Sequence, residues 1–379
     1  MNNIPLSLYI HIPWCVKKCP YCDFNSHEKN NSYDESTYTD ALISDLHTEY
    51  AQVDNRIINS IFFGGGTPSL FSAGSIARIL KAVDEATSLS KNAEITLEAN
   101  PGTFEQEKFS AYRESGINRL SIGIQSFNET HLKKLGRIHD SEQAHTAIET
   151  AKRAGFDNIN LDLMFALPEQ TIEQATKDIK TACEANVNHI SHYQLTIEPN
   201  TYFHKYPPVL PENDTSWDMQ NACHEILSQH QYYQYEVSAF SKTGKQCIHN
   251  NNYWLFGDYI GIGAGAHGKI TDSATGEKTR RWKKKQPKEY IQQALAGNAT
   301  SGFEIIKKED LFFEFLMNGL RLKDGFKIET FEQRTGLVKD DLLAALQSID
   351  VSMLDIQKDK ISTSQQGYRF LNNVLEKLL

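Results

Sequence analysis

Three cysteines lie close together near the N-terminus of this 379-residue chain, at Cys15, Cys19 and Cys22. Their spacing places three thiolates in one short loop, whereas an iron–sulfur cube or a structural zinc ion normally takes four protein ligands. A three-cysteine loop therefore leaves one metal position open for an exchangeable ligand. His11 and His27 flank the loop, so a zinc site made of three cysteines and one histidine is the alternative interpretation.

The remaining cysteines and the overall composition indicate a cytoplasmic protein. Cys183, Cys223 and Cys247 are scattered without a spacing typical of disulfides, which favours a reducing compartment. The N-terminus lacks a basic, apolar leader and the chain lacks a run of about 18 apolar residues, so we expect no integral membrane segment. A formal net charge of −9 argues against a nucleic-acid partner.

One basic run stands out in this acidic chain, at residues 280–285 (Arg-Arg-Trp-Lys-Lys-Lys). We expect it to be the solvent-exposed start of a helix that continues from Lys288. The alternative is a landing site for an anionic ligand, such as a porphyrin with propionate groups, or for an acidic partner.

The first two hundred residues alternate short β-branched runs with amphipathic helical patterns at a spacing typical of βα units. The pattern predicts six strands, at residues 6–11, 57–63, 93–99, 118–124, 158–165 and 189–196. Helices are predicted after most of them, for example at 35–50, 74–86, 142–154 and 171–185. Consecutive βα units with right-handed crossovers predict an α/β fold, a partial (β/α)6 barrel with one open side.

Glycines and polar residues occur in or after five successive predicted strands. The cysteine loop follows the first strand, and residues 64–68 (Gly-Gly-Gly-Thr-Pro) follow the second. Glu98 ends the third strand, Gln125 the fourth, and Asp162 lies in the fifth. Barrel enzymes place their sites at the carboxyl ends of the strands, and glycines there let the backbone approach a ligand closely. The pattern therefore predicts one ligand-binding mouth.

The spacing C-x3-C-x2-C, with an aromatic residue before the last cysteine, resembles the signature of the radical S-adenosylmethionine (SAM) family. The resemblance implies that Cys15, Cys19 and Cys22 ligate three irons of a [4Fe-4S] cluster and that SAM chelates the fourth. The Gly-Gly-Gly-Thr-Pro turn resembles the element that binds the methionyl amino group of SAM. Over most of its length the chain is similar to the coproporphyrinogen-oxidase-like branch. The implied SAM-binding residues are Tyr9, Tyr21, Gly65, Gly66, Thr67, Glu98, Gln125, Arg137 and Asp162.

Three features distinguish the oxygen-independent coproporphyrinogen III oxidases of this branch from its heme chaperones. The signature of the oxidases has a fourth cysteine two residues after the third. This chain has Phe24 at that position. They also carry an N-terminal extension over the substrate, whereas only fourteen residues precede Cys15. The segment from His249 to Trp254 matches the His-Asn-x-x-Tyr-Trp signature of the heme chaperones.

The resemblance thus implies a heme chaperone that binds heme and transfers it to an acceptor protein. Its contact with a membrane-bound acceptor would be transient. The alternative is an oxidase that cleaves SAM to a radical and decarboxylates propionate side chains.

The same signature predicts a heme site. A histidine beside two aromatic residues offers an axial imidazole and flat surfaces for a macrocycle, so His249 is the predicted heme ligand and His267 the second choice. The alternative is a structural His249 with Tyr253 and Trp254 in the core. Residues 261–268 are rich in glycine, but neither a βαβ unit nor an acidic residue at the ribose distance accompanies them, which argues against a dinucleotide loop.

The chain changes character near residue 300. Helical patterns at 309–322, 328–335 and 339–350, followed by a strand pair at 353–357 and 360–363, resemble a winged-helix fold. This segment is too weakly basic for DNA, and we expect it to close the open side of the barrel or to dock a partner. We predict three domains: residues 1–215 with the cluster and SAM, residues 216–299 with the His-Asn-x-x-Tyr-Trp segment, and residues 300–379.

Overall fold

Six parallel strands form the centre of the structure, a computed structural model that describes residues 4–29, 34–103 and 105–378. Each strand alternates with helices along the chain, and every neighbouring pair is parallel. This arrangement confirms the predicted partial (β/α)6 barrel. In spatial order the strands are β1 (Leu6–Ile12), β4 (Ile57–Gly65), β5 (Ser88–Ala99), β6 (Arg119–Gln125), β7 (Ile159–Phe165) and β8 (His189–Gln194).

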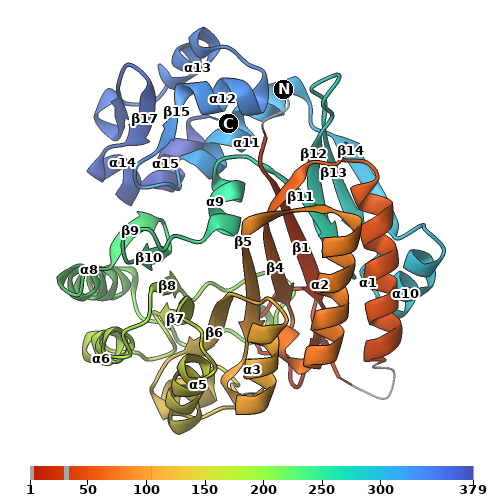
Figure 1. The fold of residues 1–379 in the computed structure, drawn as a ribbon. Helices are drawn as coiled ribbons and strands as arrows, with labels where there is room; N and C mark the ends of the chain where they lie inside the picture. Colours follow the sequence, from red (N-terminus) through yellow and green to blue (C-terminus); the bar gives the residue numbers. More distant parts are fainter. Residues whose placement is uncertain (1–3, 30–33, 104, 379) are drawn as a thin grey trace.

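Helices cover the outer face of these strands (Figure 1). Their starts follow from local sequence: Asp140 and Thr171 each begin a helix as part of a capping box, which satisfies free backbone N–H groups. No helix in the described ranges is long and apolar enough to span a bilayer. The covering helices are α1 (Glu35–Tyr50), α2 (Ala73–Ala86), α3 (Gln106–Glu114), α5 (Ser141–Arg153), α6 (Ile172–Glu184) and α8 (Asn213–Gln229).

The sheet extends beyond the six predicted strands on both sides, to twelve strands within the described residues. On one side β11 (Asp258–Ile262) pairs parallel with β1, and three antiparallel strands continue the sheet. These are β12 (His267–Thr271), β13 (Lys278–Lys283) and β14 (Thr300–Ile305). On the other side β10 (Ala239–Ser241) joins β8, followed by β9 (Tyr233–Glu236). The partial barrel is thus the centre of a larger mixed sheet.

The basic run at 280–285 is not the exposed helix start that we predicted. It lies mostly in β13, and the next helix, α10, begins only at Pro287 (Pro287–Leu295). Lys283 is 2% exposed, and its Nζ donates to Asp45 Oδ1 at 2.5 Å and to Glu49 Oε1 at 2.8 Å. The prediction failed because two carboxylates of α1 compensate this cation inside the protein.

A second hydrophobic core consists mainly of residues from Ile306 onward, after the last strand of the large sheet, and Phe256 joins it. Phe315, Phe326 and Phe331 pack edge to face in it. Its helices are α11 (Lys308–Gly319), α12 (Ile328–Thr335) and α13 (Lys339–Leu346), and its small sheet contains β15 (Phe326–Lys327), β17 (Lys360–Thr363) and β16 (Leu354–Ile356). Helices followed by a small sheet agree with the winged-helix-like fold expected here. The domain boundaries at 215/216 and 299/300 stay a prediction.

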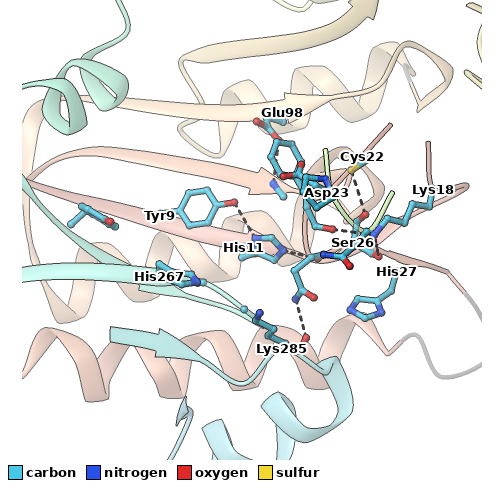
Figure 2. Close-up of a pocket in the computed structure, with 18 of the residues that line it drawn as sticks. Tyr9, His11, Lys18, Cys22, Asp23, Ser26, His27, Glu98, His267 and Lys285 are labelled. Atoms are coloured by element: carbon cyan, nitrogen blue, oxygen red, sulfur yellow. Dashed lines mark hydrogen bonds between the residues drawn. The ribbon is translucent and has the colours of Figure 1, made fainter. Parts of the chain in front are cut away.

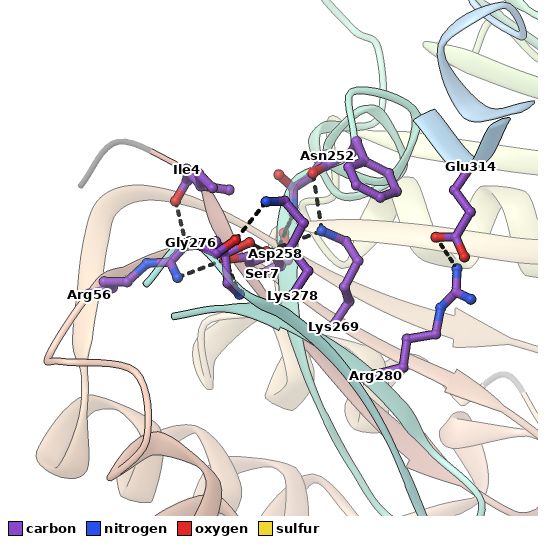
Figure 3. A network of polar contacts seen from close by, with 12 residues as sticks. Ile4, Ser7, Arg56, Asn252, Asp258, Lys269, Gly276, Lys278, Arg280 and Glu314 are labelled. Atoms are coloured by element: carbon purple, nitrogen blue, oxygen red, sulfur yellow. Dashed lines mark hydrogen bonds and ion pairs between the residues drawn. The ribbon is translucent and has the colours of Figure 1, made fainter. Parts of the chain in front are cut away.

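One buried carboxylate joins β11 to β12 and to the segment directly before β4. Asp258 is fully buried at the start of β11 and accepts hydrogen bonds from Arg56 Nη1 at 2.7 Å and from Lys269 Nζ at 3.1 Å (Figure 3). The backbone N–H and the hydroxyl of Thr271 donate to it as well, both at 3.0 Å. These contacts hold the pKa of Asp258 below its usual value despite burial.

We predict that Asp258→Asn lowers the free energy of unfolding by about 3 kcal/mol or more, because it leaves the buried Lys269 and the partly buried Arg56 without their counter-charge. Urea unfolding monitored by circular dichroism measures the change. Asp40→Asn is the matched control, since Asp40 pairs with Arg78 at the surface, and it should cost less than about 1 kcal/mol. Equal losses in the two variants would contradict the prediction.

Candidate functional site

The cysteine loop begins directly after β1, and its two ends pair with each other. The short strands β2 (Trp14–Cys15) and β3 (His27–Glu28) pair in parallel, and Lys29 N–H donates to the Cys15 carbonyl at 2.8 Å. Cys15, Cys19 and Cys22 are all partly buried and form no disulfide. The short pairing therefore closes a loop that holds three thiols at one end of the barrel.

The glycine turn after β4 lies against this loop. Gly66 N–H donates to the Ile12 carbonyl at 2.7 Å, and Thr67 N–H donates to the Trp14 carbonyl at 2.8 Å. A Cβ atom on Gly66 would lie 2.6 Å from the Trp14 carbonyl oxygen, which is too close for any side chain. Gly65 has a φ of +112°, which favours glycine, and its N–H donates to Glu98 Oε2 at 3.2 Å. These glycines permit close packing within the chain itself.

A cavity of about 310 Å³ gathers almost all of the predicted cluster and SAM residues. Tyr9 is the exception, because it lines a larger neighbouring cavity instead. Tyr193 of β8 also lines the smaller cavity, but the sequence did not predict it as a site residue, although polar residues alternate along that strand. Its hydroxyl donates to Gln125 Oε1 at 2.7 Å. The predicted residues that line the smaller cavity are Cys15, Cys19, Tyr21, Cys22, Gly65, Gly66, Thr67, Glu98, Gln125, Arg137 and Asp162.

Arg137 brings a partly buried cation next to the thiols. Its Nη1 lies 3.4 Å from Cys19 Sγ, and its Nη2 donates to the Gly123 carbonyl at 2.8 Å. Its Nε is buried and has no hydrogen-bond partner among the described residues. Gln125, which also faces this cavity, has a φ of +68°, a conformation uncommon for residues other than glycine. A guanidinium with a spare donor suits a carboxylate ligand.

Burial shifts the pKa values of several groups in the smaller cavity, among them Cys15 and Glu98. It raises the pKa of Cys15 to about 11, so the metal-free protein carries this residue as a thiol, and binding iron would release its proton. Burial and the nearby charge of Asp162 raise the pKa of Glu98 to about 8. Asp162 accepts hydrogen bonds from Ser121 Oγ and Asn160 Nδ2, both at 2.8 Å.

His249 does not line either of these two cavities. It lies on α9 (Ile248–Trp254), is 1% exposed, and borders a third cavity of about 240 Å³ inside the barrel together with Arg119. Its Nδ1 is 3.0 Å from Ser60 Oγ and its Nε2 is 3.0 Å from the Tyr253 hydroxyl. Both ring nitrogens are therefore engaged. Trp254 packs 4.2 Å under the Arg321 guanidinium, facing the C-terminal core.

The larger cavity, of about 860 Å³, lies beside the cysteine loop (Figure 2). His267 of β12 is exposed in its wall, and its ring lies 6.4 Å from that of Trp282. His11 also lines it, but Tyr9 and the Asn25 carbonyl bond both of its ring nitrogens. Among the described residues no group of three or more His, Cys, Asp or Glu side chains is arranged to hold a single metal ion.

Comparisons with known proteins identify the family. Residues 9–182 match the model of the radical SAM superfamily, and residues 306–370 match that of the HemN C-terminal domain. Heme chaperone HemW of Haemophilus influenzae is 48% identical over 383 residues, which cover 99% of this chain and 98% of that protein. HemW of Escherichia coli is 45% identical over 376 residues, with the same coverage. The chain belongs to the HemW family.

A solved structure agrees with the fold. Coproporphyrinogen III oxidase (HemN) of Escherichia coli, a radical SAM enzyme, is 24% identical to this chain, with a TM-score of 0.84 over 100% of this chain and 91% of that chain. Radical SAM proteins bind a [4Fe-4S] cluster and SAM. The smaller cavity fits both groups, because three thiols share its wall and the buried Arg137 Nε still lacks a partner within the described ranges.

We predict that replacing Cys15, Cys19 or Cys22 singly with alanine abolishes an oxygen-labile [4Fe-4S] cluster, since each thiolate would hold one iron. Iron and sulfide analysis after anaerobic reconstitution measures this. Cys183→Ala is the control, because Cys183 is buried on α6 and should not change the cluster content. Stoichiometric zinc without iron or sulfide in the anaerobically purified parent protein would refute the assignment.

We predict that Glu98→Gln stabilises the metal-free protein at about pH 8.5 but not near pH 5. Between about pH 4.5 and 8 the unfolded chain releases the Glu98 proton while the folded protein keeps it, so the folded state loses stability as pH rises. The neutral amide removes that loss. Thermal unfolding at both pH values measures the effect, with the exposed Glu85→Gln as control. A Glu98→Gln effect independent of pH would contradict the raised pKa.

Proposed function

We propose that this protein is a heme chaperone, which binds heme and transfers it to an acceptor protein. Two HemW proteins that carry this name match it over nearly their whole length. The observation that carries the proposal is the 860 Å³ cavity beside the cysteine loop, because it combines flat aromatic walls, cations and an exposed histidine.

The larger cavity has the chemistry that a heme needs. Tyr9, Tyr253 and Tyr259 supply aromatic surface for an apolar macrocycle. Lys18 and Lys285 also line it, and their ammonium groups suit the two propionates of a heme. A volume of this size lies in the range typical of cofactor sites.

We assign the axial position to His267 and an indirect role to His249. The His267 ring is exposed to the larger cavity, and no hydrogen bond to its nitrogens occurs within the described residues. Burial lowers the pKa of His249 to about 3, so this ring stays neutral between its two hydrogen-bond partners. His249 thus contributes to the heme site by fixing the hydroxyl of Tyr253, whose ring lines the cavity.

The cluster and SAM would occupy the smaller cavity. The cluster would supply one-electron redox chemistry next to SAM. Cys15, Cys19 and Cys22 would ligate the cluster, and the guanidinium of Arg137 would hold the SAM carboxylate. The remaining contacts are assigned to the predicted residues that line this cavity: Tyr21, Gly65, Gly66, Thr67, Glu98, Gln125 and Asp162. The carboxyl and amide groups in this set suit ribose hydroxyls.

We predict that His267→Ala weakens heme binding by about tenfold or more and shifts the heme absorption maximum, because the axial ligand is lost. Anaerobic titration with heme, monitored by absorption, measures both. His249→Ala should give a smaller loss of affinity and a lower melting temperature, since it removes the partner of the Tyr253 hydroxyl and one of the two partners of the Ser60 hydroxyl. His47→Ala, at an exposed position of α1, is the control and should bind heme like the parent protein.

Two outcomes would contradict the proposal. Heme affinity and spectrum unchanged in both His267→Ala and His249→Ala would remove the assigned site. Catalytic accumulation of protoporphyrinogen from coproporphyrinogen III, with reconstituted cluster, SAM and a low-potential reductant, would favour the oxidase instead.

A further inference from the structure

A cleft of about 710 Å³ lies where the C-terminal helices meet the barrel. One wall comes from α8 and the other from the segment after α11, from α14 (Gln365–Arg369) and from α15 (Leu371–Glu376). It shares no lining residue with the three cavities described above. We call it the C-terminal cleft.

The lining of the C-terminal cleft carries cations but no Asp or Glu among the described residues. Arg321 is paired with Glu236 at 3.0 Å, whereas Lys323 and Arg369 have no ion-pair partner in the described part of the chain. Partial burial and the charge of Arg369 lower the pKa of Lys323, and the neighbouring Asp324 acts in the opposite sense. Two like charges held close together in a chain of net charge −9 create a local positive potential.

Both of these cations lie over aromatic rings. Lys323 Nζ is 4.2 Å from the centre of the Tyr368 ring, and the Arg369 guanidinium carbon is 5.5 Å from that of Trp217. Ring stacking positions a cation but uses none of its N–H donors, which remain available to an anion. Large apolar side chains are also exposed in the cleft: Trp217 (38%), Met317 (40%) and Phe370 (52%).

We propose that the C-terminal cleft docks an acidic segment of a partner protein that also carries an aromatic or large aliphatic side chain. Carboxylates of the segment would pair with Lys323 and Arg369, while its apolar side chain packs on Trp217 and Phe370. Exposed Trp, Met and Arg side chains with complementary charge are typical of protein interfaces. This inference goes beyond the heme proposal, because docking requires neither heme nor the cluster.

A single-stranded nucleic acid is the other polyanion that cations and aromatic rings recognise. It needs a basic groove that follows several phosphates, whereas the C-terminal cleft offers Lys323 and Arg369 as its unpaired cations in the described residues. The net charge of −9 also repels a long polyanion. A short acidic segment places few charges where the cations are, so we favour a peptide.

Arg321 of the C-terminal cleft contacts the His-Asn-x-x-Tyr-Trp helix. The Arg321 guanidinium lies 4.2 Å over the Trp254 ring at the end of α9, and the Arg321 carbonyl accepts a hydrogen bond from the Tyr368 hydroxyl at 3.1 Å. A docked segment would therefore lie close to the helix whose His249 bonds Tyr253 of the larger cavity.

Fluorescence anisotropy with labelled probes tests this proposal on the full-length protein. The probes are a peptide of Glu-Glu-Phe repeats, a matched Lys-Lys-Phe peptide and a thymidine oligonucleotide of similar length. We expect the Glu-Glu-Phe peptide to bind and the Lys-Lys-Phe peptide not to. Lys323→Glu with Arg369→Glu should weaken binding about tenfold or more, and Lys323→Gln with Arg369→Gln should weaken it less.

The matched control is Lys91→Glu with Lys358→Glu, which changes the net charge equally at two exposed lysines elsewhere. It should leave the affinity within about twofold of the parent. Absent binding of the Glu-Glu-Phe peptide, or an equal loss in the control, would overturn the proposal. If the oligonucleotide bound more tightly than the peptide, and the same variants lost that binding, the ligand of the C-terminal cleft would be a nucleic acid and not a peptide. Heme titration should be unchanged by Lys323→Glu with Arg369→Glu, which keeps this test separate from that of the heme site.

Discussion

The parallel pairing of β1 with β11 determines where the cavities lie. In this register Leu8 is opposite Ile260, and β1 is also paired with β4 on its other side. The cysteine loop and the residues after β11 therefore leave the sheet at the same edge. Asn25 Nδ2 joins them by donating to the carbonyls of Ala264 and Lys285, both at 2.9 Å, across 239 and 260 positions of sequence. Without this pairing the larger cavity would lack one wall.

The barrel interior is polar where a complete barrel would be filled by apolar side chains. From Asp162 a line of hydrogen bonds runs through Asn160 at 2.8 Å and His189 at 2.6 Å to the Tyr235 hydroxyl at 2.8 Å. This hydroxyl accepts from Cys247 N–H at 3.3 Å, directly before α9. Buried polar groups are stable only when they are paired, so this network requires α9 to close the barrel where it does.

Local patterns predicted much of this structure. The six strands, the helices α1, α2, α5 and α6 and the cysteine loop follow from periodicity and spacing along the chain. Long-range pairs were not predictable in this way. The burial of Lys283 depends on Asp45 and Glu49, 238 and 234 positions away, and the place of Trp254 depends on Arg321 in the C-terminal part. Sequence patterns describe a residue's neighbours along the chain and not its partners across the sheet.

The larger cavity and the smaller cavity beside the cysteine loop are not independent, because they share part of their walls. Cys22, Phe24, Gly65 and Glu98 line both of them, and Phe24 is 61% exposed where they meet. A cation in the smaller cavity would favour the ionised form of Glu98, whose pKa in the metal-free protein is about 8. The larger cavity then gains a negative charge on one wall. Occupancy of one cavity thereby changes the electrostatics of the other, and by linkage the effect is reciprocal.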